Sequence, residues 1–276
     1  MRAPTLLPTL VPFSVLALPL LLAACAAPPA DESPDTSSTP IERGELPSFL
    51  LGGIQVHEAE HAEWFANLKA QGMNTVQVTD YAKQGDWDTD HMWWDEEAPW
   101  VVEEIRGAKR AGLSVVLVLR VALDHAFERN AFLWHGMIMP KTDEQLTSWF
   151  EQYGRFCAKW AEIAEREGVD VLVIGSEMNA LASTLPVADV PPLEEYFLSD
   201  KKQEERREEV LAQRELVEDK ELSLRDKERF PTVEEYLDAR IATEAGWAET
   251  TAGEGVEAIN ARRAALDRHW RDLIAD

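Results

Sequence analysis

The sequence has only two cysteines, Cys25 and Cys157, and too few basic residues to balance its acidic ones. Lysine and arginine number 27 against 51 aspartates and glutamates, which gives a formal net charge of −24 at pH 7. Binding to DNA or RNA needs a basic surface, so this composition argues against a nucleic-acid partner. Hydrophobic residues still make up 45% of the 276 residues, enough for one sizeable core or two small ones.

A long apolar run that could cross a membrane is also missing. The stretch from Leu6 to Leu22 is largely apolar, but three prolines interrupt it and it is too short for a stable spanning helix. It follows Arg2 and ends in Leu-Ala-Ala-Cys25, which resembles a bacterial lipoprotein signal with its lipobox. That resemblance implies cleavage before Cys25 and attachment of palmitate-type acyl chains, which together hold a protein at a membrane. The alternative is an ordinary secretory signal in which Cys25 is incidental.

The residues after Cys25 extend this interpretation. Ala26 and Ala27 follow without an aspartate, which resembles an outer-membrane destination if the organism is Gram-negative. We therefore expect an exported protein, lipid-anchored to the cell envelope, with residues 1–25 as signal peptide. Residues 26–48 are rich in Pro, Ser, Thr, Asp and Glu and are predicted to form a flexible tether. With Cys25 acylated, Cys157 has no disulfide partner and is expected to be buried packing.

A repeated pattern from residue 49 predicts alternating strands and helices. Three helix-like stretches end at Gly72, Gly112 and Gly168, and each runs directly into an apolar segment. Glycine suits the left-handed residue that ends a helix, and continuous Val/Leu/Ile runs are typical of parallel strands buried on both faces. The run Phe49–Val56 adds a strand before the first helix. Strands are expected to end near Val56, Val78, Arg120 and Ile174, and helices are expected at about 58–71, 97–111 and 143–167.

The order β-α-β-α-β-α-β predicts an α/β fold, namely a partial (half) TIM barrel with parallel strands. Its four βα units would occupy residues 49–185. A charged, mainly helical insertion is expected at 186–255 after strand four, and 256–276 is expected to supply the fourth barrel helix. A full barrel usually takes about 250 folded residues, so only half of one is visible.

The strongest candidate for a site is Glu177, which follows the most apolar strand, Val171–Ile174. Ligands of parallel α/β folds meet the C-terminal ends of strands, and a glutamate in a partly apolar pocket suits a general acid. It is equally compatible with a carboxylate at the start of a helix. Asn179 is placed either to bind a sugar hydroxyl or to cap the next helix.

Several segments together resemble glycoside hydrolase family 113, the β-mannanase type of (β/α)₈ barrel. They are Gly112–Arg120, Trp134-His135-Gly136, the aromatic stripe from Trp149 to Trp160, and Ile174-Gly175-Ser176-Glu177. The resemblance implies that Glu177 is the acid/base of a retaining glycosidase. His135 departs from the Trp-Arg-Gly-like segment of the family, which puts sugar contacts at that position in doubt.

Aromatic and acidic residues after strand ends complete the expected site. Trp93, Trp94 and Trp134 are expected to stack on sugar rings, although tryptophan is more often core. A retaining mechanism needs a second carboxylate about 5–5.5 Å from the first, and the family takes it from a later strand. The sequence therefore predicts a chain that is truncated, completes its barrel by self-association, or is not catalytic. Acids that could face Glu177 are Glu58, Asp80, Asp86, Asp88 and Asp124, of which Asp124, beside His125, is best placed.

A competing motif is His57-Glu58-Ala59-Glu60-His61, which matches H-E-x-x-H. On a helix, His57 and His61 would share one face and could bind zinc, with Glu58 as general base. The motif sits at a strand-to-helix junction, where a solvated first turn is the simpler interpretation.

Three functions remain open from the sequence. The first is a glycoside-hydrolase-like lipoprotein that acts on or binds a β-linked polysaccharide through Glu177. The second is a non-catalytic carbohydrate-binding or structural lipoprotein, and the third is a zinc metallopeptidase. For the first two we expect no cofactor; the partners are then a polysaccharide or oligosaccharide and, through the lipid, a membrane.

Overall fold

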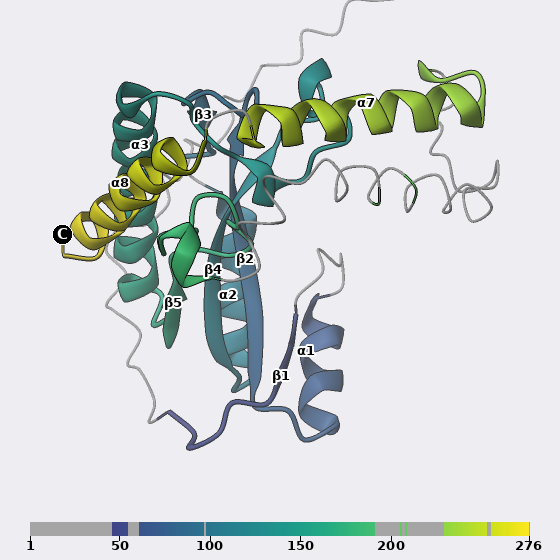
Figure 1. Ribbon diagram of the computed structural model, residues 1–276. Coiled ribbons are helices and arrows are strands. Elements are labelled where there is room, and N and C mark those ends of the chain that lie inside the picture. The colour runs from purple at the N-terminus through teal and green to yellow at the C-terminus, as the bar shows by residue number, and fades with distance from the viewer. Residues whose placement is uncertain are drawn as a thin grey trace, which may run out of the picture. The chain divides into compact units, whose positions relative to one another are not determined.

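The computed structural model describes residues 46–54, 61–96, 98–190, 205, 208, 229–252 and 255–275 (Figure 1). All of them lie in one compact unit, Thr39–Asp276. Within these residues, no helix has the length and apolar character needed to cross a bilayer. The signal segment, Cys25 and residues 26–45 of the expected tether lie outside the described residues.

The strands form one mostly parallel sheet, as the sequence predicts. They are β1 (Gly52–Ile54), β2 (Thr75–Gln84), β4 (Ser114–Leu123) and β5 (Val171–Val173), hydrogen-bonded in the order β1-β2-β4-β5. All three of these pairings are parallel. The short strand β3 (Met92–Trp93) runs antiparallel to the end of β2. The α/β fold with a partial barrel sheet is thus confirmed.

The helices lie close to their expected positions. They are α1 (His61–Ala70), α2 (Pro99–Arg110), α3 (Asp143–Arg166), α7 (Val233–Ala252) and α8 (Gly255–Ala275), with three short 3₁₀ turns, η1 (Glu128–Asn130), η2 (His135–Met137) and η3 (Val187–Asp189). Gly72, Gly112 and Gly168, which join helix to strand, have φ angles of 84°, 73° and 65°. A side chain at these positions would be strained, which explains the repeated glycine.

The core lies between the sheet and the helices α2 and α3. Trp149, Tyr153, Phe156 and Trp160 follow one face of α3, and each is completely buried. The indole N–H of Trp149 donates to Oε1 of Gln84 at 2.9 Å, so the amide of Gln84 at the end of β2 is satisfied inside the core. Cys157 lies on the same helix as a buried free thiol, as expected.

An ion pair with a buried carboxylate joins α2 to the end of α3. Glu167 is 1% exposed and accepts two hydrogen bonds from Arg106, at 2.7 and 2.9 Å, and one from Arg166 at 2.9 Å. Burial raises the pKa of Glu167, but the two guanidinium groups outweigh it and hold that pKa below its usual value. The carboxylate therefore stays ionised and fixes the turn that leads into β5.

Two strands are longer than the sequence indicated. The second strand was expected to end near Val78 but continues to Gln84, and the third continues from Arg120 to Leu123. The polar residues Thr79, Asp80 and Gln84 within β2 concealed this extension. Gln84 is accommodated because its side chain accepts from the indole N–H of Trp149 and donates to the carbonyl groups of Asp86 and Thr89.

The C-terminal helix α8 packs alongside α3 (Figure 1). The ring of His269 stacks on Phe150, with centroids 4.8 Å apart and planes 7° apart. Trp270 contacts Phe150 and Tyr153 edge-on, at 5.3 and 6.2 Å. A helix thus occupies the segment expected at 256–276, and α7 lies within the expected insertion at 186–255.

Candidate functional site

The two faces of the sheet differ in what they carry. One face, here called the helix face, contains Val76, Leu119 and Gln84, which are buried beneath the helices. Side chains alternate along a strand, so Tyr81 and Lys83 of β2 lie on the opposite, inner face. Tyr81 is 38% exposed and is paired in register with Arg120 of β4. Polar and charged side chains therefore gather on the inner face at the C-terminal ends of the strands.

Glu177 lies at this end of the sheet, just after β5, and both of its carboxylate oxygens are engaged. Oε1 accepts a hydrogen bond from Nη2 of Arg120 at 3.1 Å, and Oε2 lies 2.7 Å from Nε2 of His135. The Glu177 side chain is 46% exposed, while those of Arg120 and His135 are 20% and 22% exposed. The site is thus an accessible carboxylate held between two less accessible basic groups.

The backbone at Glu177 is strained. Its φ angle is +58°, in the left-handed region that residues with a side chain rarely adopt. Arg120 also donates from Nε to the Oγ of Ser176 at 3.0 Å, so the turn is held from the neighbouring strand. Strain of this kind is concentrated at functional sites, because surrounding contacts must maintain it.

The segment Trp134-His135-Gly136 forms the rim next to Glu177. Trp134 is 41% exposed, and its ring centroid lies 5.4 Å from that of His135. A Cβ atom at Gly136 would come within 2.2 Å of the Trp134 ring, so only glycine allows this arrangement. The carbonyl of Gly136 accepts from the backbone N–H of Ala180 at 2.9 Å, which ties the rim to the segment after Glu177.

Trp93 belongs to a second aromatic group on the same face. It pairs with Lys83 across the β2–β3 ladder, and its ring contacts His91 at 4.9 Å and Phe127 at 6.1 Å. Trp94 differs, because it packs against Phe156 of α3 at 5.7 Å and belongs to the core. Of the two adjacent tryptophans, Trp93 is therefore the one placed for a ligand.

Asp124 and Asn179 make local contacts. Oδ1 of Asp124 accepts from the backbone N–H of Ala126 at 2.8 Å, which stabilises the turn after β4. The carbonyl of Asn179 accepts from the hydroxyl of Ser183 at 2.7 Å, and the residue is exposed. Within the described residues, the polar contacts of Glu177 are with Arg120 and His135 rather than with either of these.

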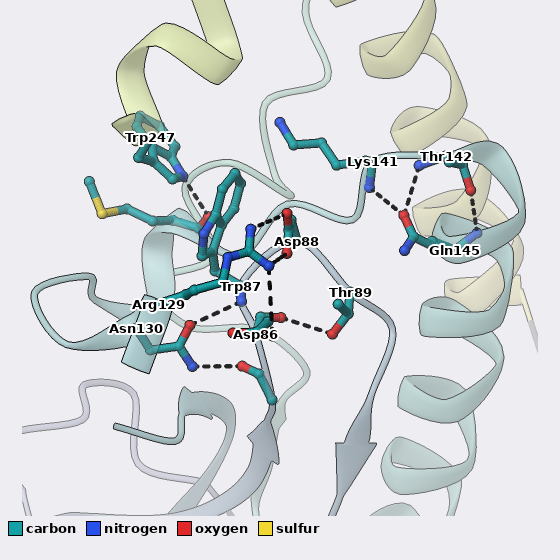
Figure 2. A network of polar contacts seen from close by, with 12 residues as sticks. Asp86, Trp87, Asp88, Thr89, Arg129, Asn130, Lys141, Thr142, Gln145 and Trp247 are labelled. Carbon is teal, nitrogen blue, oxygen red and sulfur yellow. Dashed lines mark hydrogen bonds and ion pairs between the residues drawn. The ribbon is translucent and has the colours of Figure 1, made fainter. Parts of the chain in front are cut away.

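The remaining acidic candidates do not meet Glu177 in the described part of the chain. Asp80 lies within β2 on the helix face and is 5% exposed, so its expected place after a strand end was wrong. Asp88 forms an ion pair with Arg129 at 2.8 Å, and Asp86 lies 3.6 Å from the same guanidinium (Figure 2). Glu58 lies outside the described residues.

The histidine motif is described only at its last position. His57 and Glu58 are outside the described residues, while His61 begins α1 and its ring packs 5.7 Å from Phe65. Over the described ranges, no three His, Cys, Asp or Glu residues are grouped so as to hold a metal ion.

The sequence did not identify four residues of the inner face as part of the site, namely Arg120, Tyr81, Lys83 and Phe127. The signal for Arg120 was present, since it is a charge that ends the apolar run from Val115 to Leu119. Tyr81 and Lys83 were hidden because the strand appeared to end at Val78. Phe127 could not be found, because only the fold brings it against Trp93.

A family model matches part of the chain. Residues 55–184, just under half of the chain, match the model of Glycoside Hydrolase Family 113. This region is a GH113-like domain. It includes β2, β4 and β5, together with Arg120, His135 and Glu177, so the site described above lies within the GH113-like domain.

Solved GH113 structures resemble the chain only over part of their length. A GH113 β-mannanase from Alicyclobacillus acidocaldarius, solved in complex with ManMIm, is 18% identical, with a TM-score of 0.39 over 47% of this chain and 44% of that one. A GH113 β-1,4-mannanase is 21% identical, with a TM-score of 0.38 over 47% and 46%. The chain thus spans less than half the length of these structures. A search among curated proteins gives no match.

Proposed function

We propose that the GH113-like domain binds and acts on a β-linked polysaccharide of the mannan type, with Glu177 as the acid/base. The observation that carries the proposal is the position of Glu177, an exposed carboxylate at the C-terminal end of a parallel sheet. Trp134, next to His135, and Trp93, beside Phe127, supply aromatic faces suited to sugar rings. The family match, together with the naming of solved GH113 structures as β-mannanases, supports the choice of a β-linked mannan.

In this proposal Glu177 protonates the oxygen of the leaving sugar. His135 Nε2 lies 2.7 Å from Oε2, close enough for the pair to exchange a proton, while Arg120 orients the carboxyl group through Oε1. A complete retaining mechanism requires a second carboxylate about 5–5.5 Å away. Among the described residues, Arg120 and His135 hold Glu177, and neither is a carboxylate. Hydrolysis therefore requires a further carboxylate group.

Hydrolysis is tested by incubating the full chain with β-1,4-mannan and manno-oligosaccharides and measuring new reducing ends. We expect wild-type turnover and a loss of at least about a hundredfold in Glu177→Gln, which keeps the shape but cannot donate a proton. Trp100→Phe, an exposed change on α2, is the matched control and is expected to keep full activity. Absence of turnover by the wild-type chain would contradict catalysis.

Binding without hydrolysis is the second candidate, and one observation favours it. Both oxygens of Glu177 are already engaged by basic side chains, so the oxygen of a leaving sugar would have to compete with these contacts for the carboxyl group. Isothermal titration calorimetry with a manno-oligosaccharide separates the two candidates. Heat of binding with no new reducing ends would select the binding protein.

We also propose that the chain is exported and anchored to the cell envelope through lipid on Cys25. The support is the Leu-Ala-Ala-Cys25 sequence after an apolar segment. Labelled palmitate fed to cells that express the chain is expected to appear on the wild-type protein. A Cys25→Ala variant that remained labelled to the same extent would contradict the anchor.

A further inference from the structure

We propose that Trp247 of α7 and Trp270 of α8 are positioning residues that hold His135 and Glu177 together. Both lie outside residues 55–184, the region that matches the family model. Each donates an indole hydrogen bond to a backbone carbonyl in one of the two segments that meet at the site. This role rests on the proposed function of Glu177. The contacts themselves are present without a ligand.

Trp247 holds the segment that carries His135. Its indole N–H donates to the carbonyl of Met137 at 3.0 Å, two residues after His135 (Figure 2). Its ring also lies 6.4 Å from that of Trp87, which is buried and has Arg129 and Lys141 over its faces at 5.7 and 4.8 Å. The ring of Trp247 therefore contacts a buried tryptophan of the core.

The beginning of α7 and the residues before it contact the same segment near Phe132. Phe230 and Tyr236 lie 5.5 and 5.2 Å from the ring of Phe132, and they are 5.7 Å from each other. Arg229 lies 3.6 Å from the carboxylate of Glu128. The region from residue 229 to Trp247 thus contacts the segment between β4 and α3 on both sides of Trp134, which fixes its position relative to the sheet.

Trp270 holds the segment that carries Glu177. Its indole N–H donates to the carbonyl of Leu181 at 2.9 Å, and its ring lies against Gly175, where an added Cβ would be 3.4 Å away. The ring is fixed in turn by edge contacts with Phe150 and Tyr153 of α3. Trp270 therefore contacts the turn on both sides of Glu177.

The two segments are joined between these anchors by the bond from Ala180 N–H to the carbonyl of Gly136. Surface connections are mobile unless tied down, and a 2.7 Å contact between two side chains tolerates little movement. The strained φ angle of Glu177 also needs external contacts to persist. Removing either indole donor should therefore loosen the contact between His135 and Glu177 before it unfolds the protein.

The test is nuclear magnetic resonance on the full chain with labelled histidine, which follows the exchange of the His135 ring N–H with water. The His135 signal is assigned from its absence in His135→Gln, and Glu177→Ala gives the rate for a pair without its acceptor. Trp247→Phe and Trp270→Phe each keep an aromatic ring and lose the donor. We expect each to raise the His135 exchange rate on the order of tenfold, toward the Glu177→Ala value.

Two controls separate positioning from general loosening. Trp100→Phe makes the same chemical change on an exposed face of α2 and is expected to leave the His135 rate unchanged. His125, whose Nε2 lies 3.1 Å from the carbonyl of Leu133, reports on the beginning of the same segment and should change little in any of these variants. A wild-type rate for His135 in both Trp247→Phe and Trp270→Phe overturns the proposal.

If Trp247→Phe does not fold, Tyr236→Ala tests the same helix from its other end. It removes the edge contact with Phe132 without touching Met137 and should raise the His135 rate in the same direction. An unchanged rate in that variant also counts against the role of α7. None of these measurements requires a sugar. If the protein does not bind carbohydrate, the exchange rates still show whether Trp247 and Trp270 hold His135 and Glu177 together.

Discussion

Glu177 and Ala98 are the described residues other than glycine with a positive φ angle, at 58° and 33°. A left-handed conformation costs a residue with a Cβ atom about 1–2 kcal/mol. The sequence placed Glu177 at the end of a strand and so indicated a site. It could not show the strain, because the conformation arises from contacts of Arg120 and Trp270 that come from other elements.

The strain at Glu177 predicts an inverted order of stability for two variants. Glu177→Ala and Glu177→Gly both remove the carboxylate, but only glycine relieves the left-handed backbone. We expect the glycine variant to be more stable than the alanine variant by about 1 kcal/mol, opposite to the usual cost of glycine. Urea unfolding followed by circular dichroism measures the difference. Equal stabilities would mean that the backbone at this position is not strained.

Asp80 gives a second prediction at this scale, through pH. Burial raises its pKa from 3.8 to about 6, while the backbone N–H of Tyr81 and the charge of Lys159 oppose that effect. The folded protein therefore holds this proton more tightly than the unfolded chain. The resulting stabilisation is complete below about pH 4 and is lost as the pH rises through 6.

The change that isolates this effect is Asp80→Asn, which cannot ionise. Relative to wild type, we expect its free energy of unfolding to increase by about 2 kcal/mol between pH 4 and pH 7, because only the wild type loses stability over this range. Asp189→Asn, on an exposed residue of η3, is the control and should show no such trend. A constant difference between Asp80→Asn and wild type across this range would contradict a buried, protonated Asp80.

At the scale of elements, sequence patterns located helices well and strand ends poorly. In the sequence, Thr142 and Gln145 have the spacing of a capping box at the start of α3, and the structure shows both of its hydrogen bonds (Figure 2). Caps depend on neighbours in sequence, so they can be predicted. The extension of β2 to Gln84 depends on pairing with β4 and β3 and on the core contact with Trp149, which no local pattern shows.

The cap of α3 predicts a measurable loss of stability. Thr142→Ala removes the hydroxyl that accepts from the N–H of Gln145 and should lower the free energy of unfolding by about 1 kcal/mol. Thr147→Ala, at an exposed position inside the same helix, should change it by less than about 0.5 kcal/mol. Thermal unfolding of the two variants side by side gives the comparison, and equal losses would show that the cap is not stabilising.

At the scale of the whole molecule, the GH113-like sheet carries Glu177, and the helices α7 and α8 contact the two segments that meet at its carboxylate. The order of strands and helices predicted the sheet because each element follows from periodicity and glycine placement. The contribution of α7 and α8 could not be predicted, because Trp247 and Met137 are far apart in sequence and a single indole bond leaves no pattern. The net charge of −24 also does not identify a ligand.

The central claim is that a sugar binds on the inner face of the sheet, at the C-terminal ends of the strands. The most direct test titrates the full chain with a β-1,4-linked manno-oligosaccharide and follows the tryptophan indole signals by nuclear magnetic resonance. We predict saturable shifts of the Trp134 and Trp93 signals, while Trp100 on the outer face of α2 stays unchanged. Shifts that occurred at Trp100 alone, or no shift at Trp134 with millimolar sugar, would contradict a carbohydrate site beside Glu177.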